Sequence, residues 1–144
     1  MLATGVFDLL HIGHLRFLEE SKKRGGPSSK LVVVVARDKT VVRRKGKGPV
    51  VPEEQRRKLV AALRVVDRAV LGKEELDLLG VLKEVKPDIV CVGYDQNEIR
   101  IAVTRLIKIE RLAIRVVRIR RLGPSAFSSS SKLKNRVARV WAKN

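Results

Sequence analysis

The chain has 144 residues, enough for one domain with a buried core and too few for two independent domains. Lysine and arginine number 32 against 15 acidic residues, so the formal charge is +17 and the chain must attract anions such as nucleotides, nucleic acid or anionic lipid. The sequence contains no run of 18 or more apolar residues, so we expect a cytoplasmic protein without a membrane partner.

The aromatic and cysteine content argues against a single-strand nucleic-acid binder and against a disulfide-linked fold. Aromatic residues make up only 3% of the chain, and the basic residues are spread along it. This pattern lacks the stacking platforms of single-strand binders, so nucleic acid is a weaker expectation than a nucleotide. The single cysteine, Cys91, excludes an intrachain disulfide, and its place in the apolar run IVCVG predicts a buried thiol.

Strand and helix patterns alternate from the first residues to the last. Continuous apolar runs predict strands over residues 2–7, 31–36, 66–71, 88–93 and 114–119. Amphipathic spacing and capping residues predict helices over residues 14–24, 52–63, 74–85, 97–112 and 131–141. The basic, glycine-bearing stretch 43–51 is expected to be a loop.

Regular alternation of this kind is typical of right-handed β-α-β crossovers. We therefore expect an α/β fold consisting of a single Rossmann-like domain over residues 1–144. Its five-stranded parallel sheet should have helices on both faces. In such sheets ligands bind at the carboxyl ends of the strands, where the strand order reverses.

Two histidines occupy the predicted turn between the first strand and the first helix. His11 and His14 flank Gly13 in the segment GVFDLLHIGH, and they are the only histidines in the chain. Glycine allows close approach of the backbone to a phosphate, and a helix N-terminus presents N–H groups to an anion. A capping turn is the alternative interpretation. Because no third ligand of the usual kind lies at a suitable spacing, we assign no metal ligand among the protein side chains.

Three further segments follow predicted strands or precede a helix. The basic stretch RRKGKGP carries Lys45 and Lys47, which could reach a phosphate or could simply be solvated. The segment GYDQ places Gly93 and Asp95 after the fourth strand, where they suit a ribose or base edge, or a turn and helix cap. The serine run 128–131 precedes a basic helix and suits an anion site or a linker.

The segment that contains His11 and His14 resembles the HxGH motif of the nucleotidylyltransferase superfamily, of cytidylyltransferase-like type. The stretch that runs from Ala36-Arg37-Asp38 through KGKGP to PEEQRR is similar to the corresponding stretch of archaeal FAD synthases. The serine run resembles the serine and threonine motif that precedes the last helix in the family. The cysteines that many archaeal FAD synthases carry just before this motif are missing from residues 123–127.

The resemblance implies a role for each matching position. Four residues are expected to be catalytic through contacts to phosphates: His11, His14, Lys45 and Arg56. The acceptor is expected to contact Asp38 and Lys47. Residues expected to bind the nucleotide, with Asp8 organising the turn, are Gly5, Val6, Phe7, Asp8, Gly13, Gly93, Asp95, Ser129 and Ser130.

The reaction that the resemblance implies is transfer of AMP from ATP to the phosphate of FMN, with a divalent ion such as Mg²⁺ bound together with the nucleotide. An acceptor phosphate is already an anion, so the reaction needs alignment and charge stabilisation rather than a general base. A CTP-dependent cytidylyltransferase acting on glycerol 3-phosphate or a similar phosphate stays open, as does a basic nucleic-acid-binding module without turnover. A homodimer is also compatible with the family.

Overall fold

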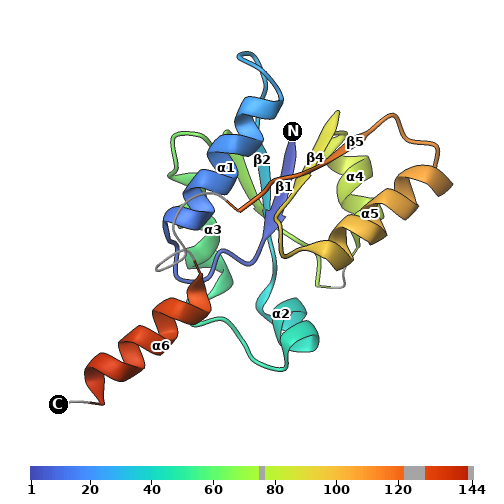
Figure 1. The fold of residues 1–144 in the computed structure, drawn as a ribbon. Helices are drawn as coiled ribbons and strands as arrows, with labels where there is room; N and C mark the ends of the chain where they lie inside the picture. Colours follow the sequence, from blue (N-terminus) through green and yellow to red (C-terminus); the bar gives the residue numbers. More distant parts are fainter. Residues whose placement is uncertain (75–76, 122–128, 143–144) are drawn as a thin grey trace.

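The computed structural model describes residues 1–74, 77–121 and 129–142, and within them the chain forms one α/β domain. The five strands are β1 (Leu2–Gly5), β2 (Val32–Val35), β3 (Arg68–Leu71), β4 (Ile89–Val92) and β5 (Arg115–Arg118). All pairs are parallel, in the order β3-β2-β1-β4-β5 (Figure 1). The predicted parallel sheet is therefore confirmed, and its strand order reverses between β1 and β4.

In the part of the chain that the structure describes, six helices connect or follow these strands. They are α1 (Ile12–Arg24), α2 (Asp38–Lys45), α3 (Glu53–Ala61), α4 (Leu78–Val85), α5 (Asn97–Ile109) and α6 (Ser130–Trp141). The helix predicted from residue 74 begins at Leu78, where the Asp77 carboxylate accepts the backbone N–H of Gly80 as an N-cap. Part of the predicted segment, residues 75–76, lies outside the described residues.

Helix α2 was missed by the sequence prediction, which treated residues 43–51 as a loop. Asp38 lies in the first turn of α2 and three cations lie in its last turn, an arrangement that complements the helix dipole. Gly46 then ends the helix in the left-handed region, with φ of 69°, and donates its N–H to Val42. Two turns of helix thus carry Lys45 toward the carboxyl ends of the strands.

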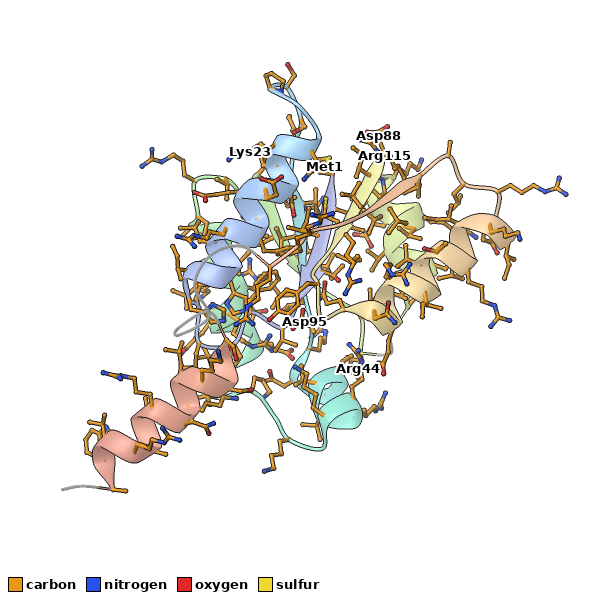
Figure 2. The ribbon with its side chains drawn as sticks, in the orientation of Figure 1. Met1, Lys23, Arg44, Asp88, Asp95 and Arg115 are labelled. Carbon is orange, nitrogen blue, oxygen red and sulfur yellow. The ribbon has the colours of Figure 1, made fainter. Side chains whose placement is uncertain are left out.

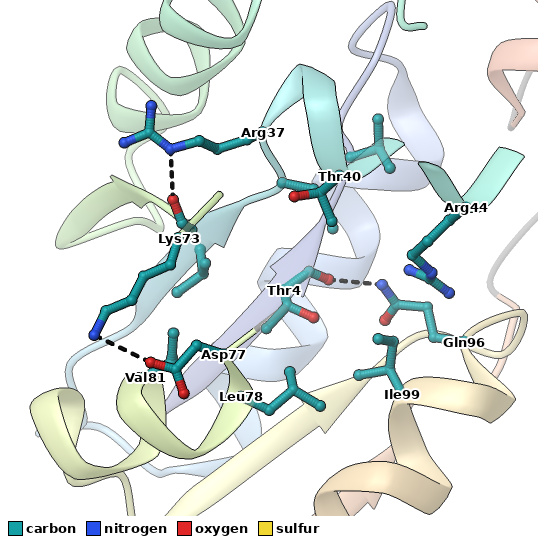
Figure 3. A pocket seen from close by; sticks show the side chains of 15 residues that line it. Thr4, Arg37, Thr40, Arg44, Lys73, Asp77, Leu78, Val81, Gln96 and Ile99 are labelled. Carbon is teal, nitrogen blue, oxygen red and sulfur yellow. Dashed lines mark hydrogen bonds and ion pairs between the residues drawn. The ribbon is translucent and has the colours of Figure 1, made fainter. Parts of the chain in front are cut away.

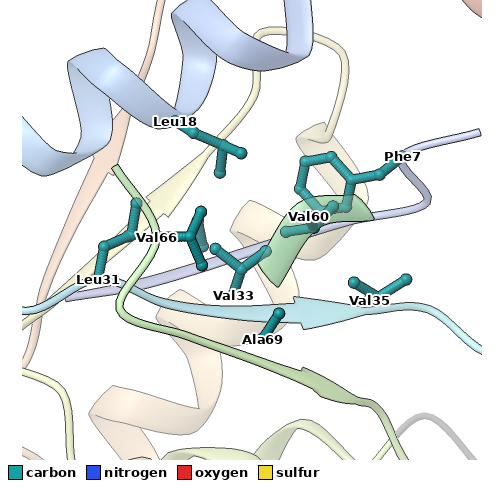
Figure 4. Close-up of a cluster of buried hydrophobic side chains, with 9 residues drawn as sticks. Phe7, Leu18, Leu31, Val33, Val35, Val60, Val66 and Ala69 are labelled. Carbon is teal, nitrogen blue, oxygen red and sulfur yellow. The ribbon is translucent and has the colours of Figure 1, made fainter. Parts of the chain in front are cut away.

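The core has two layers because the strands bury both of their faces. In β2, Val33 and Val35 pack with Leu18 of α1 and Val60 of α3 on one face of the sheet (Figure 4). Val34 points to the other face and packs in the cluster that contains residues of α4 and α5. Continuous apolar strands of this kind are what a doubly covered parallel sheet requires.

The basic side chains are distributed over the surface rather than gathered in one patch. Lys23 and Arg115 lie at one end of the sheet and Arg44 at the other end (Figure 2). Among the described residues, no helix combines the length and apolar character needed to cross a membrane. The +17 charge therefore points to no single surface.

Candidate active site

A cavity of about 570 Å³ opens at the switch point between β1 and β4. It is walled by the turn after β1, the start of α1, the end of α2 with the following loop, the end of β4 and the first turns of α6. Most of the predicted site residues line it, namely Gly5, Val6, Phe7, Asp8, His11, Gly13, His14, Lys45, Lys47, Gly93, Asp95, Ser129 and Ser130. Arg56 and Asp38 are the predicted residues that are not among the lining residues.

The two histidines form a stacked pair at the start of α1. Their ring centroids are 3.8 Å apart with an interplanar angle of 21°. Nδ1 of His11 accepts the N–H of Gly13 at 3.1 Å, and Nδ1 of His14 accepts the N–H of His11 at 3.4 Å. A neutral imidazole that accepts at Nδ1 carries its proton on Nε2. Each ring is thus held in one tautomer, with an Nε2–H donor left for a ligand.

The same environment keeps both rings neutral. Burial lowers the pKa of His11 below its ordinary value. Burial and the adjacent His11 lower the pKa of His14 to about 3, and the carboxylate of Asp8 opposes this only in part. Protonation of both stacked rings is unfavourable, because the two positive charges would repel each other in a partly desolvated site. At neutral pH the pair therefore presents two N–H donors without a fixed positive charge.

The depressed pKa of His14 makes the stability of the fold depend on pH. Below 6.5 an unfolded chain protonates this histidine, whereas the folded chain resists protonation until about pH 3. The free energy of unfolding should therefore fall with pH by up to about 1.4 kcal/mol per unit, or about 2 kcal/mol between pH 7 and pH 5. Urea unfolding at the two pH values measures this change. His14→Asn should remove most of it, and an equal loss in that variant would contradict the assignment.

Asp8 ties together three segments that wall the cavity. Its buried carboxylate accepts the N–H groups of Val50 and Val51, each at 3.0 Å, and pairs with Nζ of Lys134 at 2.8 Å. The Ser130 hydroxyl donates to the carbonyl oxygen of Asp8. Burial alone would raise the pKa of Asp8, but the bonds from Lys134, Val51 and Val50 outweigh it and lower the pKa. Asp8 therefore joins the first turn, the basic loop and α6.

The turn that carries Asp8 has a strained backbone. Phe7 and Leu9, on either side of Asp8, have positive φ values of 53° and 46°. Residues other than glycine rarely adopt such values, and they do so where the surrounding contacts enforce them. A side chain at Gly5 would lie 2.8 Å from the buried ring of Phe7, so any larger residue there would force that ring to move. The conformation of this turn is thus fixed by the hydrogen bonds of Asp8 and by the packing of Phe7 against Gly5.

The cavity contains more cations than the sequence predicted. Besides Lys45 and Lys47, its lining includes Arg44, Arg120, Arg121 and Lys134. The guanidinium of Arg121 lies 5.6 Å from the ring centroid of Tyr94, another lining residue. Helical spacing could have found Lys134, because it follows Ser130 by four residues and so shares its face of α6. The cavity therefore suits a polyanion with several phosphate groups.

Arg56, predicted to contact a phosphate directly, is buried behind the cavity and does not line it. Its side chain is 0% exposed, and its guanidinium donates to Val6, Ala36, Val51 and the carboxylate of Asp38. Every side-chain nitrogen of Arg56 thus already bonds to an acceptor of the chain itself. We assign Arg56 as a residue that positions the ends of β1 and β2, and Asp38 as its partner at the start of α2.

The floor of the cavity is braced at the switch point by Gln96. Its side chain accepts the N–H of Gly93 at 2.7 Å and donates to the carbonyl oxygen of Thr4 at 2.9 Å. The loop after β4 is thereby tied to β1. Asp95, beside this brace, lines the cavity together with Asp8, and no group of three histidine, cysteine or carboxylate residues suited to a metal ion occurs among the described residues.

Comparison with known proteins identifies the family. The profile of the family described as "Cytidylyltransferase-like" matches residues 2–136. The chain belongs to the cytidylyltransferase-like family. This membership confirms the resemblance of the HxGH segment, and it supports a nucleotidyltransferase.

Individual relatives within this cytidylyltransferase-like family extend over nearly the full chain. A FAD synthase of Archaeoglobus profundus is 44% identical over 140 residues, which are 97% of this chain and 86% of the relative. A FAD synthase of Methanopyrus kandleri is 46% identical over 141 residues, 98% of this chain and 93% of the relative. The crystal structure of the lipopolysaccharide core biosynthesis protein of Thermoplasma volcanium has a TM-score of 0.71 and 44% identity, covering 85% of this chain and 96% of that one.

Proposed function

We propose that the chain is a FAD synthase, which transfers AMP from ATP to FMN and releases pyrophosphate. The observation that carries this proposal is the stacked His11 and His14 pair in a cation-lined cavity, on a chain whose FAD synthase relatives match nearly all of its length. A phosphate oxygen of FMN attacks the α-phosphorus of ATP. The bond from that phosphorus to the oxygen of the β-phosphate breaks, and pyrophosphate leaves.

The roles of the site residues follow from their positions. The Nε2–H groups of His11 and His14 donate to phosphate oxygens on which charge grows during the attack, and Lys45 and Lys47 add positive charge from the loop after α2. Ser129 and Ser130 contribute the start of α6, whose N–H groups favour an anion. No general base is needed, because the attacking phosphate is ionised at neutral pH.

A divalent ion fits this site only as part of the nucleotide complex. The lining contains two carboxylates, and that of Asp8 is engaged by Lys134 and two N–H groups. Asp95 is the remaining acidic lining residue among those described. We infer that Asp95 would help to hold a Mg²⁺ ion that arrives bound to the nucleotide, and that such an ion would offset negative charge on the pyrophosphate leaving group.

A second, smaller cavity lies beside the histidine cavity. It measures about 80 Å³ and adjoins the first cavity, sharing Thr4, Gly5, Val6, Arg44 and Gln96 with it (Figure 3). Its other walls combine the apolar side chains of Val34, Leu78, Val81 and Ile99 with the polar side chains of Arg37, Thr40, Lys73 and Asp77. We propose that the flavin ring enters this slot, which must widen to hold it, while its phosphate reaches the histidines. A glycerol phosphate acceptor would leave the slot empty.

The test is to incubate the protein with Mg²⁺ and each pairing of ATP or CTP with FMN or glycerol 3-phosphate. FAD should form from ATP and FMN, with one pyrophosphate released per FAD. Turnover restricted to CTP and glycerol 3-phosphate would retain the family chemistry but overturn the substrates proposed for this chain. Absence of turnover in every pairing would overturn the enzymatic proposal.

A bulky side chain in the small cavity should weaken binding of FMN without weakening binding of ATP. Val81→Trp places a large ring in the small cavity, so the KM for FMN should rise by about tenfold or more while the KM for ATP changes little. Glu84→Trp is the matched control, because Glu84 lies on the same helix with an exposed side chain. Steady-state kinetics with each substrate varied in turn would separate the two constants. Equal effects of both variants on FMN would contradict the slot assignment.

A further inference from the structure

Arg44 is the charged side chain that the two cavities have in common. Arg44 lies in the last turn of α2, and Figure 3 shows its side chain pointing toward Gln96. Lys45 and Lys47 line the large cavity, which contains the histidines, but not the small one. Among the described residues, the others that line both cavities are uncharged, namely Thr4, Gly5, Val6 and Gln96. The guanidinium of Arg44 therefore lies at the border between the large cavity and the small one.

The ion pair that holds this guanidinium is exposed to solvent. Nη2 of Arg44 donates to Oε2 of Glu98 at 3.1 Å, and the side chain of Glu98 is 87% exposed. Ion pairs with such access to water contribute little to stability, because the surrounding solvent screens them. Glu98 also lies in the first turn of α5, where the helix dipole favours a carboxylate whether or not Arg44 is near. The pair between Arg44 and Glu98 can therefore open at a small cost in free energy.

We propose that Arg44 exchanges Glu98 for the phosphate of the acceptor, and so selects an acceptor that carries both a ring and a phosphate monoester. This inference rests on the proposed function. A phosphate monoester carries more negative charge than a carboxylate, and the planar guanidinium can bond two of its oxygens at once. Because Arg44 borders both cavities, it can bond a phosphate in the large cavity whose ring occupies the small one.

The phosphates of the nucleotide are the other possible ligand of Arg44. The residues proposed to receive them, His11, His14, Ser129 and Ser130, all line the large cavity and not the small one. A nucleotide held by these residues has no need to reach the border of the small cavity. The acceptor must cross that border, because its ring and its phosphate are proposed to lie on opposite sides of it. The position of Arg44 therefore favours the phosphate of the acceptor.

Two flavins that differ by one phosphate test this assignment without turnover. FMN carries the phosphate, whereas riboflavin has the same ring and no phosphate. In Arg44→Gln the Kd for FMN should rise by about tenfold or more, because a charge-assisted bond to the phosphate is lost, while the Kd for riboflavin should change by less than about twofold. Flavin fluorescence titrations of the parent chain and the variant measure both constants. An equal change for the two flavins, or no change for FMN, would overturn the proposal.

Steady-state kinetics separate the acceptor from the nucleotide. Arg44→Gln should raise the KM for FMN by about tenfold or more, with kcat at saturating FMN and the KM for ATP each within about twofold of the parent values. Arg43→Gln is the matched control, because it removes the same charge from the preceding residue of α2, which is exposed and lines neither cavity. A raised KM for ATP in place of FMN, or equal effects of the two variants, would overturn the proposal.

The fold should tolerate the loss of Arg44. Its printed partner, Glu98, is exposed, so the unfolding midpoint of Arg44→Gln should stay close to that of the parent chain. Arg44→Lys, which keeps the charge without the planar fork, should recover part of the lost affinity for FMN but not that of the parent. Affinity for FMN no better in Arg44→Lys than in Arg44→Gln would contradict a bond from this position to a phosphate.

Removing the competing carboxylate tests the exchange itself. Glu98→Gln frees Arg44, so the KM for FMN should fall by about two- to fivefold, and the same change should have no effect in an Arg44→Gln background. An unchanged or raised KM in Glu98→Gln would contradict the exchange. If the parent chain forms no FAD from ATP and FMN, the proposed function fails. If the parent forms FAD and Arg44→Gln does so with an unchanged KM for FMN, this inference alone fails.

Discussion

Replacing His14 by asparagine is expected to lower kcat for AMP transfer by about 10²–10³-fold with the fold retained. Asparagine offers an oxygen near the position of Nδ1, so it can still accept the N–H of His11. It has no donor at the position of Nε2, which is the group proposed to meet the phosphate. The loss should therefore fall on kcat, while circular dichroism and the unfolding midpoint at pH 8 stay close to those of the parent chain.

Variants of the neighbouring histidine sharpen this test. His11→Asn should behave similarly, because asparagine is a good N-cap and can accept the Gly13 N–H that His11 accepts now. His14→Gln keeps a donor near Nε2 but loses the acceptor for His11, so it should retain more activity than His14→Asn. If the two His14 variants were equally active, or if either asparagine variant kept near-normal kcat, the proposed role of the Nε2–H groups would be refuted.

The sequence predicted the sheet and the location of the site from one regularity. Apolar runs such as LVVVVA alternate with amphipathic segments, and near-continuous apolar runs are typical of strands covered on both faces. The polar motifs follow the ends of these runs. Since parallel strands end at the same edge, His11, Lys45, Asp95 and Ser129 were expected to converge, and all four line the same cavity.

The residues whose place was not predicted from the sequence are held by contacts with residues distant in the chain. Asp38 and Arg56 belong to a basic segment that reads as a solvated loop followed by a helix. Local composition does not reveal that the guanidinium turns inward to bond carbonyl oxygens of two strand ends. Lys134 could have been found from its helical spacing to Ser130, but its ion pair with Asp8, a residue distant in sequence, could not be foreseen. The high content of basic residues made Arg56 and Lys134 hard to single out, because a chain with a formal charge of +17 has many similar cations.

Arg56→Met is expected to destabilise the fold by about 3–5 kcal/mol, because it leaves buried acceptors without their donor. The carbonyl oxygens of Val51 and Ala36, each 2.8 Å from a guanidinium nitrogen, and that of Val6 would lose their bonds. For a chain of this size the melting temperature should fall by roughly 10–20 °C. Thermal and urea unfolding monitored by circular dichroism would measure both quantities.

The adjacent Arg57 provides a control, because the same substitution there removes an exposed arginine instead of a buried one. Its guanidinium pairs with Glu54 three residues away at 3.0 Å, on the surface, so Arg57→Met should cost about 0–1 kcal/mol. A direct phosphate contact by Arg56 would give the opposite pattern, with normal unfolding of Arg56→Met and a raised KM for ATP. If Arg56 instead holds the ends of β1 and β2 in place, the main effect of Arg56→Met should be a loss of stability rather than a raised KM for ATP. Any activity that survives at low temperature should then show a near-normal KM, because the histidines and lysines that meet the phosphates are still present.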